Sequence, residues 1–199
     1  SPASPAPKPA PTSTVSAKGV ARCAATAVTK RTVRYAATAG VAANLQSLDL
    51  YRPTLPAGCP RTPIVLYVHG GGWRRGDKAQ QITRKVDLFA RQQGWLFISV
   101  NYRLSPDPLD LTSPTAVRAP THAKDVAAAI GWVTRNARAN GADPTRVATA
   151  GHSAGAHGVS TLGTDQTLLA AAKVPRASVR CVVSLDSAGF DVAQAIRVN

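Results

Sequence analysis

Runs of apolar residues divide this chain into predicted strands. Continuous apolar runs at residues 63–68 and 95–100 indicate strands that are buried on both faces, and a further strand is expected at 179–185. Two earlier segments, 28–35 and 45–51, mix polar and apolar positions with β-branched residues, and we expect them to form an antiparallel hairpin. Buried strands that alternate with helical segments are typical of a mostly parallel α/β sheet, so we expect that fold class.

Helical periodicity lies between these strands. Apolar residues at helical spacing predict helices at about 80–93 and 122–139, and shorter helices are expected at about 166–172 and 191–197. The Pro- and Asp-rich segment 105–120 is expected to be a surface loop. The sequence therefore alternates strand and helix over most of its length, with no visible internal repeat.

A further strand, at residues 146–150, follows a predicted turn at 141–144 and runs into Gly-His-Ser-Ala-Gly at 151–155. Small, helix-compatible residues continue to about Gly163. A Gly-x-Ser-x-Gly pentapeptide between a strand and a helix suits a nucleophile elbow, a strained turn that exposes the serine hydroxyl at a helix N-terminus. By chance the pattern occurs about once in 3,000 positions at ordinary glycine and serine frequencies, so a plain Gly/Ser-rich turn is the alternative.

The sequence His-Gly-Gly-Gly-Trp at residues 69–73 directly follows the strand at 63–68. Consecutive glycines let backbone N–H groups turn toward one point with no side chains in the way. An oxyanion hole needs such donors about 3 Å from the developing oxyanion. The alternatives are a flexible glycine turn and a phosphate-binding loop, but the Gly-x-x-x-x-Gly-Lys-Ser/Thr pattern of the latter does not occur.

Composition and charge limit the possible classes of function but do not identify one. The 199 residues are 44% hydrophobic, enough for one domain with a sizeable core. The formal net charge is +14, but the Lys and Arg residues are scattered and aromatic residues are only 5%. This favours a solvated basic surface over a nucleic-acid partner. No run of 18 apolar residues occurs, so no membrane-spanning helix is expected.

The N-terminal end and the cysteines point to secretion. Residues 1–20 are rich in Pro and Ala and are expected to form a flexible tether before a single domain at 21–199. The chain does not begin with Met and has no apolar leader, which fits a mature secreted protein. Cys23 and Cys59 flank the predicted hairpin, and antiparallel pairing would bring them together, so we expect a disulfide rather than two free thiols. Cys181 is then left over.

Taken together, these motifs resemble the α/β-hydrolase superfamily, and within it the secreted His-Gly-Gly-Gly carboxylesterases and lipases that include feruloyl-esterase-like enzymes. Other segments that carry the resemblance are 48–53, 101–106, Asp125, 141–144 and 184–191. The resemblance implies an α/β-hydrolase fold with the hairpin at its start, and hydrolysis of a small-molecule or polymer-linked carboxylic ester without cofactor or metal. It does not identify the substrate.

The resemblance also implies residue roles. Ser153 would be the nucleophile that forms an acyl-enzyme. The backbone N–H groups of Gly71, Gly72 and Ala154 would form the oxyanion hole. Trp73 would pack beside the substrate pocket. His69 would order the glycine loop, and Asp125 would anchor a helix or loop.

The acid and the base are harder to identify. In the family they follow the serine in the order Asp or Glu, then His, after the seventh and eighth strands. His157 is the one histidine after Ser153, and it is expected to lie on a helix that runs away beneath the sheet. Asp186 ends the last predicted strand and is a candidate acid, with a structural loop role as the alternative.

We therefore expect residues 1–199 to be about the N-terminal two-thirds of an esterase, with six of eight strands and a C-terminal segment completing the fold. Without a base, this stretch alone is expected to have negligible esterase turnover. A non-catalytic binding protein on the same fold and an amidase or formamidase are the alternative functions.

Overall fold

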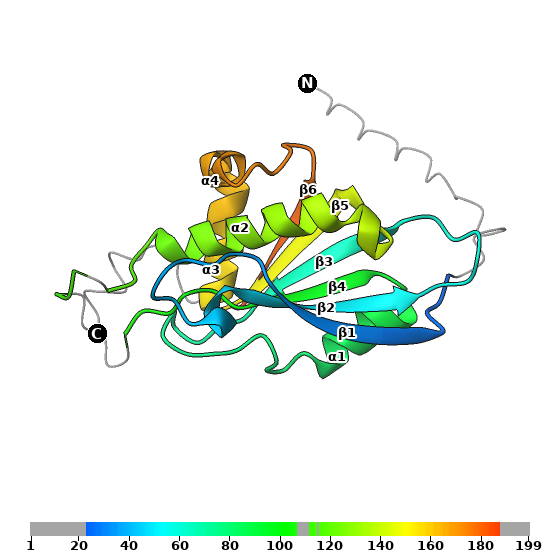
Figure 1. The fold of residues 1–199 in the computed structure, drawn as a ribbon, viewed down its shortest axis with the longest axis horizontal. Helices are drawn as coiled ribbons and strands as arrows, with labels where there is room; N and C mark the ends of the chain where they lie inside the picture. The colour runs from blue at the N-terminus through cyan, green and yellow to red at the C-terminus, as the bar shows by residue number, and fades with distance from the viewer. Residues whose placement is uncertain (1–22, 107–111, 115, 188–199) are drawn as a thin grey trace, which may run out of the picture.

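The computed structural model describes residues 23–106, 112–114 and 116–187. Within them, six strands form one sheet in the order β1-β2-β4-β3-β5-β6 (Figure 1). The strands are β1 (Ala27–Arg34), β2 (Ser47–Thr54), β3 (Thr62–Val68), β4 (Leu96–Val100), β5 (Ala142–His152) and β6 (Val179–Leu185). Strand β2 is antiparallel to both β1 and β4, and the remaining neighbours are parallel. The predicted α/β sheet with an N-terminal antiparallel hairpin is confirmed.

Helices cover both faces of this sheet. The α-helices are α1 (Thr83–Lys85), α2 (Thr121–Asn136), α3 (Ala154–Thr164) and α4 (Gln166–Ala171). Helix α1 continues as a π-helix over Val86–Gln92, and short 3₁₀ turns occur at Ala43–Gln46 and Arg138–Asn140. Figure 1 shows α2 and α1 on opposite faces of the sheet.

Two elements differ in detail from their prediction. The helix predicted from residue 80 begins at Thr83, and Ile82 before it provides no side-chain cap. Of the residues predicted as a turn at 141–144, Gly141 does lie in a turn, but Ala142 already begins β5, because it pairs with Thr62 at the start of β3. The register then shifts before Val147 pairs with Ile64, so the pairing of β5 with β3 is irregular where the turn was predicted.

Each face of the sheet has its own core. The larger core joins the central strands to α2 and α3 through residues such as Leu66, Ile98 and Ile130. The smaller one packs Ile82, Val86 and other residues of the α1 region against the opposite face. Alternating side chains of β3 and β4 feed both cores, which explains their continuous apolar runs. The central strands therefore provide a rigid base for the loops at their carboxyl ends.

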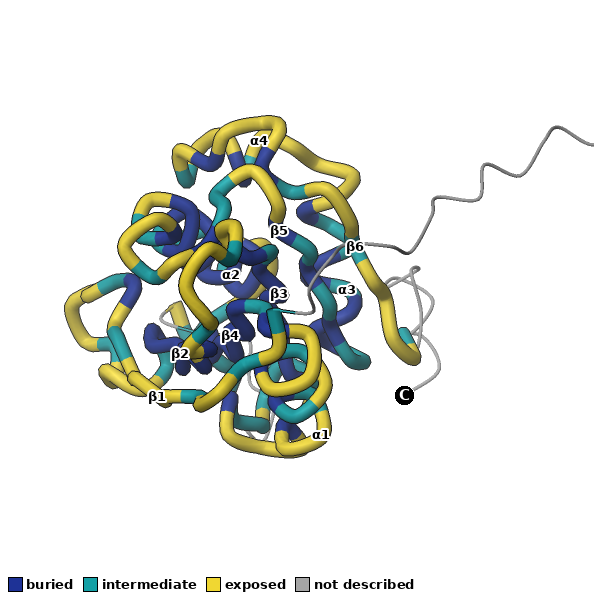
Figure 2. The backbone as a smooth tube through the Cα atoms, turned by 90° about the vertical axis from the view of Figure 1, so that its right-hand side faces the viewer, coloured by how far each residue is buried: buried dark blue, intermediate teal, exposed yellow. Residues whose placement is uncertain are grey.

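The outer edge of the sheet at β6 is far more exposed than its centre. Figure 2 shows β3 and β4 buried, whereas much of β6 is exposed. Val183 and Leu185 retain 39% and 41% of their accessible surface. In native proteins such apolar edges are usually covered by another element.

The disulfide predicted between Cys23 and Cys59 is present, and Cys181 is a free, exposed thiol. The bridge closes a loop with a sequence separation of 36 residues that contains the whole β1–β2 hairpin. Loop-closure entropy predicts that replacing both cysteines by serine lowers the free energy of unfolding by about 3–4 kcal/mol. Urea unfolding of the two proteins measures this difference. Alkylation of both Cys23 and Cys59 without prior reduction would show that the disulfide does not form.

Some predicted features lie outside the described residues. These are the tether at 1–20, the helix at 191–197 and part of the loop at 105–120. In the part of the chain that the structure describes, no helix has the length and apolar character needed to span a membrane.

Candidate active site

Ser153 lies at the junction of β5 and α3, with φ of 51° and ψ of −117°. A non-glycine residue held in such a sparsely populated conformation costs on the order of 1–3 kcal/mol and persists only where its surroundings enforce it. Backbone hydrogen bonds hold Ser153 in this conformation, since its N–H donates to the carbonyl of Leu185 at 3.0 Å. Its own carbonyl accepts from the His157 N–H at 3.1 Å. This is the strained turn that the pentapeptide predicted.

The elbow is packed so closely against β3 that a side chain at Gly155 has no room. A Cβ added there would collide with the carbonyl oxygen of Val68 and lie 2.6 Å from that of His69. Helix α3 can therefore begin directly against the end of β3 because position 155 is glycine. The second glycine of the pentapeptide sets the position of the helix that follows Ser153.

The glycine loop after β3 lies against the elbow. A Cβ built on Gly70 would lie 3.0 Å from the carbonyl oxygen of His152 and 3.1 Å from the Cβ of Ser153, so the glycine loop packs closely against the elbow. Gly71 has φ of 112°, and its carbonyl accepts from the N–H groups of Arg74 and Arg75 at 3.2 and 3.0 Å. This tight turn leaves no space for a Cβ at Gly71. Two segments about 80 residues apart are thus brought to one point, as the oxyanion-hole prediction requires.

Several backbone donors are available at this point. In the described residues, no backbone hydrogen bond is made by the N–H groups of Gly71 or Gly72. Ala154 is the first residue of α3, where N–H groups lack an intrahelical acceptor and the helix dipole favours negative charge. These are the three donors expected from the sequence. Their convergence on a bound substrate's oxygen stays a prediction.

His69 is buried beneath the glycine loop. Its ring stacks on that of Tyr102 with centroids 4.6 Å apart, and the Tyr102 hydroxyl donates to the His69 carbonyl at 3.1 Å. The His69 Nδ1 lies 2.7 Å from the Gly70 carbonyl, an acceptor, which places the ring proton on Nδ1. Burial lowers the His69 pKa, although the hydrogen bond to Gly70 opposes this. A neutral histidine in this place holds the loop, in agreement with the role expected for it.

Comparison with known proteins identifies the group to which this arrangement belongs. The family model BD-FAE matches residues 48–186, which include both the glycine loop and the elbow. The chain belongs to the BD-FAE family.

Relatives and solved structures agree with this assignment. The chain is 36% identical over 116 residues to esterase LipC of Mycobacterium tuberculosis, covering 56% of this chain and 25% of LipC. It is 39% identical over 95 residues to carboxylesterase NlhH of the same species, covering 47% of this chain and 26% of NlhH. The crystal structure of esterase B from Lactobacillus rhamnosis matches with a TM-score of 0.57 and 27% identity, over 78% of this chain and 46% of that one. The chain thus spans about a quarter of the length of these curated relatives.

In this BD-FAE chain, Trp73 connects the glycine loop to its surroundings. Its carbonyl accepts from the Ser105 N–H at 2.8 Å, and its ring meets the His157 ring edge-on at 5.5 Å. A cavity of about 10 Å³, the size of one water molecule, touches Trp73 and Ala154. Trp73 therefore lies beside the proposed oxyanion hole, and its contact with a substrate remains a prediction.

The BD-FAE chain has four histidines, all in described residues, and none of their rings hydrogen-bonds the Ser153 hydroxyl. His122 lies 3.0 Å from the Ser105 hydroxyl, and His157 contacts Trp73. The His152 Nε2 lies 3.7 Å from the Asp186 carboxylate, with side-chain exposures of 45% and 91%. The structure therefore brings Ser153 and the glycine loop together, but it shows no base hydrogen-bonded to the Ser153 hydroxyl. Asp186 stays a candidate acid.

Asp125 and Tyr102 anchor the segment that follows β4. The carboxylate of Asp125, which is 2% exposed, accepts from the backbone N–H and both sides of the Arg103 guanidinium at 2.7–2.9 Å. Such a two-pronged charged pair fixes geometry strongly. The sequence identified Asp125 as an anchor but gave Tyr102 no role. The available signal was the position of Asn-Tyr-Arg-Leu-Ser-Pro directly after β4.

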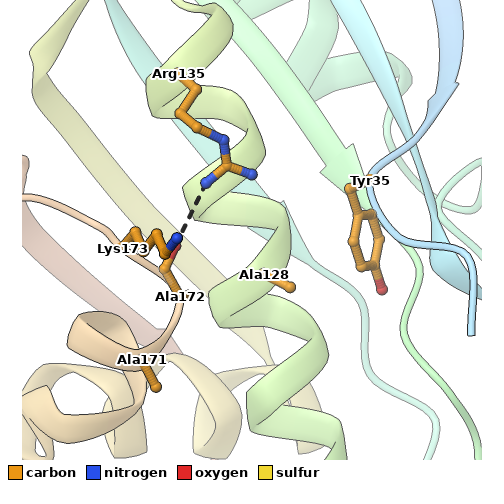
Figure 3. A pocket seen from close by; sticks show the side chains of 6 residues that line it. All are labelled: Tyr35, Ala128, Arg135, Ala171, Ala172 and Lys173. Atoms are coloured by element: carbon orange, nitrogen blue, oxygen red, sulfur yellow. Dashed lines mark hydrogen bonds between the residues drawn. The ribbon is translucent and has the colours of Figure 1, made fainter.

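A separate cavity of about 400 Å³ lies beside α2, lined by residues of that helix, by Tyr35 and by residues 171–173 (Figure 3). There the Arg135 guanidinium extends toward the Ala172 carbonyl, 3.4 Å away. The lining residues are Tyr35, Ala128, Arg135, Ala171, Ala172 and Lys173. None of the predicted site residues lines this cavity.

Proposed function

We propose that this BD-FAE chain carries the nucleophile and oxyanion hole of a carboxylic ester hydrolase. The observation that supports it most is the strained backbone of Ser153 at the strand–helix junction, with the glycine loop in contact. The Ser153 hydroxyl attacks the ester carbonyl, and the N–H groups of Gly71, Gly72 and Ala154 stabilise the tetrahedral oxyanion. The alcohol leaves, and water then hydrolyses the acyl-enzyme to release the acid.

The general base comes from outside residues 1–199 in this proposal, whereas Asp186 remains a candidate acid within them. Serine needs a base to remove its proton, and none of the four histidine rings hydrogen-bonds the Ser153 hydroxyl. The relatives LipC and NlhH are matched over only 25% and 26% of their lengths. The same additional segment would cover the exposed apolar edge of β6. We call residues 1–199 joined to that segment the complete enzyme.

The substrate is a small-molecule or polymer-linked ester, and the protein is secreted. The disulfide between Cys23 and Cys59 supports secretion, because such bonds persist in oxidising compartments. An amide or formamide substrate would use the same nucleophile and donors, so a panel of ester and amide substrates separates these activities. A protein that binds without catalysis would leave Ser153 unreactive toward a fluorophosphonate.

Residues 1–199 alone are expected to hydrolyse p-nitrophenyl acetate no faster than their Ser153→Ala variant, whereas the complete enzyme turns it over. The physical reason is that Ser153 is a weak nucleophile without a base. Both proteins are assayed at the same concentration by release of p-nitrophenolate. Hydrolysis by residues 1–199 that Ser153→Ala abolishes would show that the base lies within this stretch.

A further inference from the structure

The glycine loop is held at its far end by the carboxylate of Asp77. One oxygen of this carboxylate accepts from the Nδ2 groups of Asn44 and Asn101 at 2.9 and 2.8 Å. The other oxygen accepts from the Ala79 N–H at 2.8 Å. Three donors from three separate segments therefore meet on one side chain, a short distance along the chain from the glycine run at 70–72.

The neighbouring residue, Lys78, extends this attachment into the core. Its N–H donates to the Asn101 Oδ1 at 2.6 Å, and its carbonyl accepts from the Ser99 hydroxyl at 2.7 Å. Its ammonium group, which is almost fully buried, donates to the Asn44 Oδ1 at 2.7 Å and lies 3.9 Å from Asp49. Asp77 and Lys78 thus tie the end of the loop to the carboxyl end of β4 and to the 3₁₀ turn at Ala43–Gln46.

The loop needs such attachment because of its composition. Residues 70–72 and 76 are glycines, which lose more conformational freedom on ordering than any other residue. Oxyanion donors lower the barrier only when they are already in place. The start of the loop is set by β3 and by His69 on Tyr102, and its middle by Trp73 bonded to Ser105. Its far end is held by the hydrogen bonds that the Asp77 carboxylate accepts.

We propose that Asp77 is a positioning residue for the oxyanion hole, acting through Asn44, Asn101 and the backbone at Ala79 to hold Gly71 and Gly72 in place. This inference rests on the proposed esterase function. It assigns a catalytic consequence to a polar cluster that does not touch Ser153.

The ionised state of Asp77 suits this role. Burial alone would raise its pKa, but the hydrogen bonds from Asn101, Asn44 and Ala79 outweigh burial and lower the pKa to about 2. These three partners are all donors, so the carboxylate acts toward them purely as an acceptor. Asparagine has the same shape but presents an NH₂ group in place of one oxygen, and must therefore face at least one donor with a donor.

The test is Asp77→Asn in the complete enzyme, with p-nitrophenyl acetate as substrate. We expect kcat to fall by about 10²-fold with KM changed by less than about 2-fold, because misplaced donors weaken transition-state binding and leave ground-state binding intact. Asp87→Asn is the matched control, since Asp87 pairs with Arg91 on the π-helix. It should leave kcat unchanged. Asn44→Ala, at an exposed position, should also lower kcat, but by less than Asp77→Asn, in a protein that folds normally.

Hydrogen exchange separates this inference from the proposed function. In residues 1–199, Asp77→Asn should accelerate exchange of the Arg74 and Arg75 amides, which donate to the Gly71 carbonyl, by about 10-fold or more relative to Asp87→Asn. If the complete enzyme is active but neither kcat nor this exchange responds to Asp77→Asn or Asn44→Ala, the positioning role is wrong and the esterase function stands. If no Ser153-dependent hydrolysis exists, the esterase function fails, and unchanged exchange at the Arg74 and Arg75 amides would overturn the anchoring role as well.

Discussion

Replacing Ser153 by alanine is expected to lower kcat/KM of the complete enzyme for p-nitrophenyl acetate by about 10⁴–10⁶-fold. The substitution removes the hydroxyl that forms the acyl-enzyme, so only binding and the oxyanion hole remain. Because alanine keeps the Cβ of the serine, the loss of activity is not a packing defect. The measurement is initial rate against substrate concentration for both proteins.

Ser160→Ala is the matched control for this experiment. Ser160 lies on the same helix, α3, and is likewise half-buried, but it has no part in the proposed chemistry. Its kcat/KM should equal that of the unsubstituted enzyme. If Ser153→Ala retained more than about a hundredth of the activity, water attack without an acyl-enzyme would have to replace the proposed mechanism.

Gly155→Ala is expected to lower the free energy of unfolding by about 3 kcal/mol, a loss typical of severe overpacking. The new methyl group would collide with the carbonyl oxygen of Val68, a rigid backbone atom at the end of β3. Helix α3 would have to move away from the strand that carries the glycine loop. Urea unfolding of residues 1–199 and of the variant measures the change.

Gly158→Ala provides the internal comparison on the same helix. A Cβ at Gly158 meets no atom within 4 Å, so the substitution should be neutral or stabilise by up to about 1 kcal/mol through helix propensity. Equal losses for Gly155→Ala and Gly158→Ala would show that helix α3 does not approach β3 as closely as described.

Local patterns account for what the sequence predicted. The apolar runs of β3 and β4 predicted buried strands because side chains on both faces of these strands meet a hydrophobic environment. The pentapeptide at 151–155 predicted the strained Ser153 because glycine before and after a nucleophile is a steric requirement. Cys23 and Cys59 could be paired because they flank adjacent antiparallel strands.

Contacts between distant residues account for what the sequence did not reveal. Asp77 accepts hydrogen bonds from Asn44 and Asn101, which are 33 and 24 residues away in the sequence. Hydrophobic periodicity does not predict such a polar cluster. The stacking of His69 on Tyr102 likewise depends on the adjacency of β3 and β4. Neither the sequence nor the structure pairs Ser153 with a base, because none of the four histidine rings hydrogen-bonds its hydroxyl.

The most direct test of Ser153 as an activated nucleophile is to map the residue that a fluorophosphonate modifies. The complete enzyme is treated with the reagent, digested and analysed by mass spectrometry, beside its Ser153→Ala variant. We predict a single rapid adduct on the peptide that contains Ser153, and no adduct in the variant. An unmodified Ser153, or an equal adduct in both proteins, would contradict the proposed role of this serine.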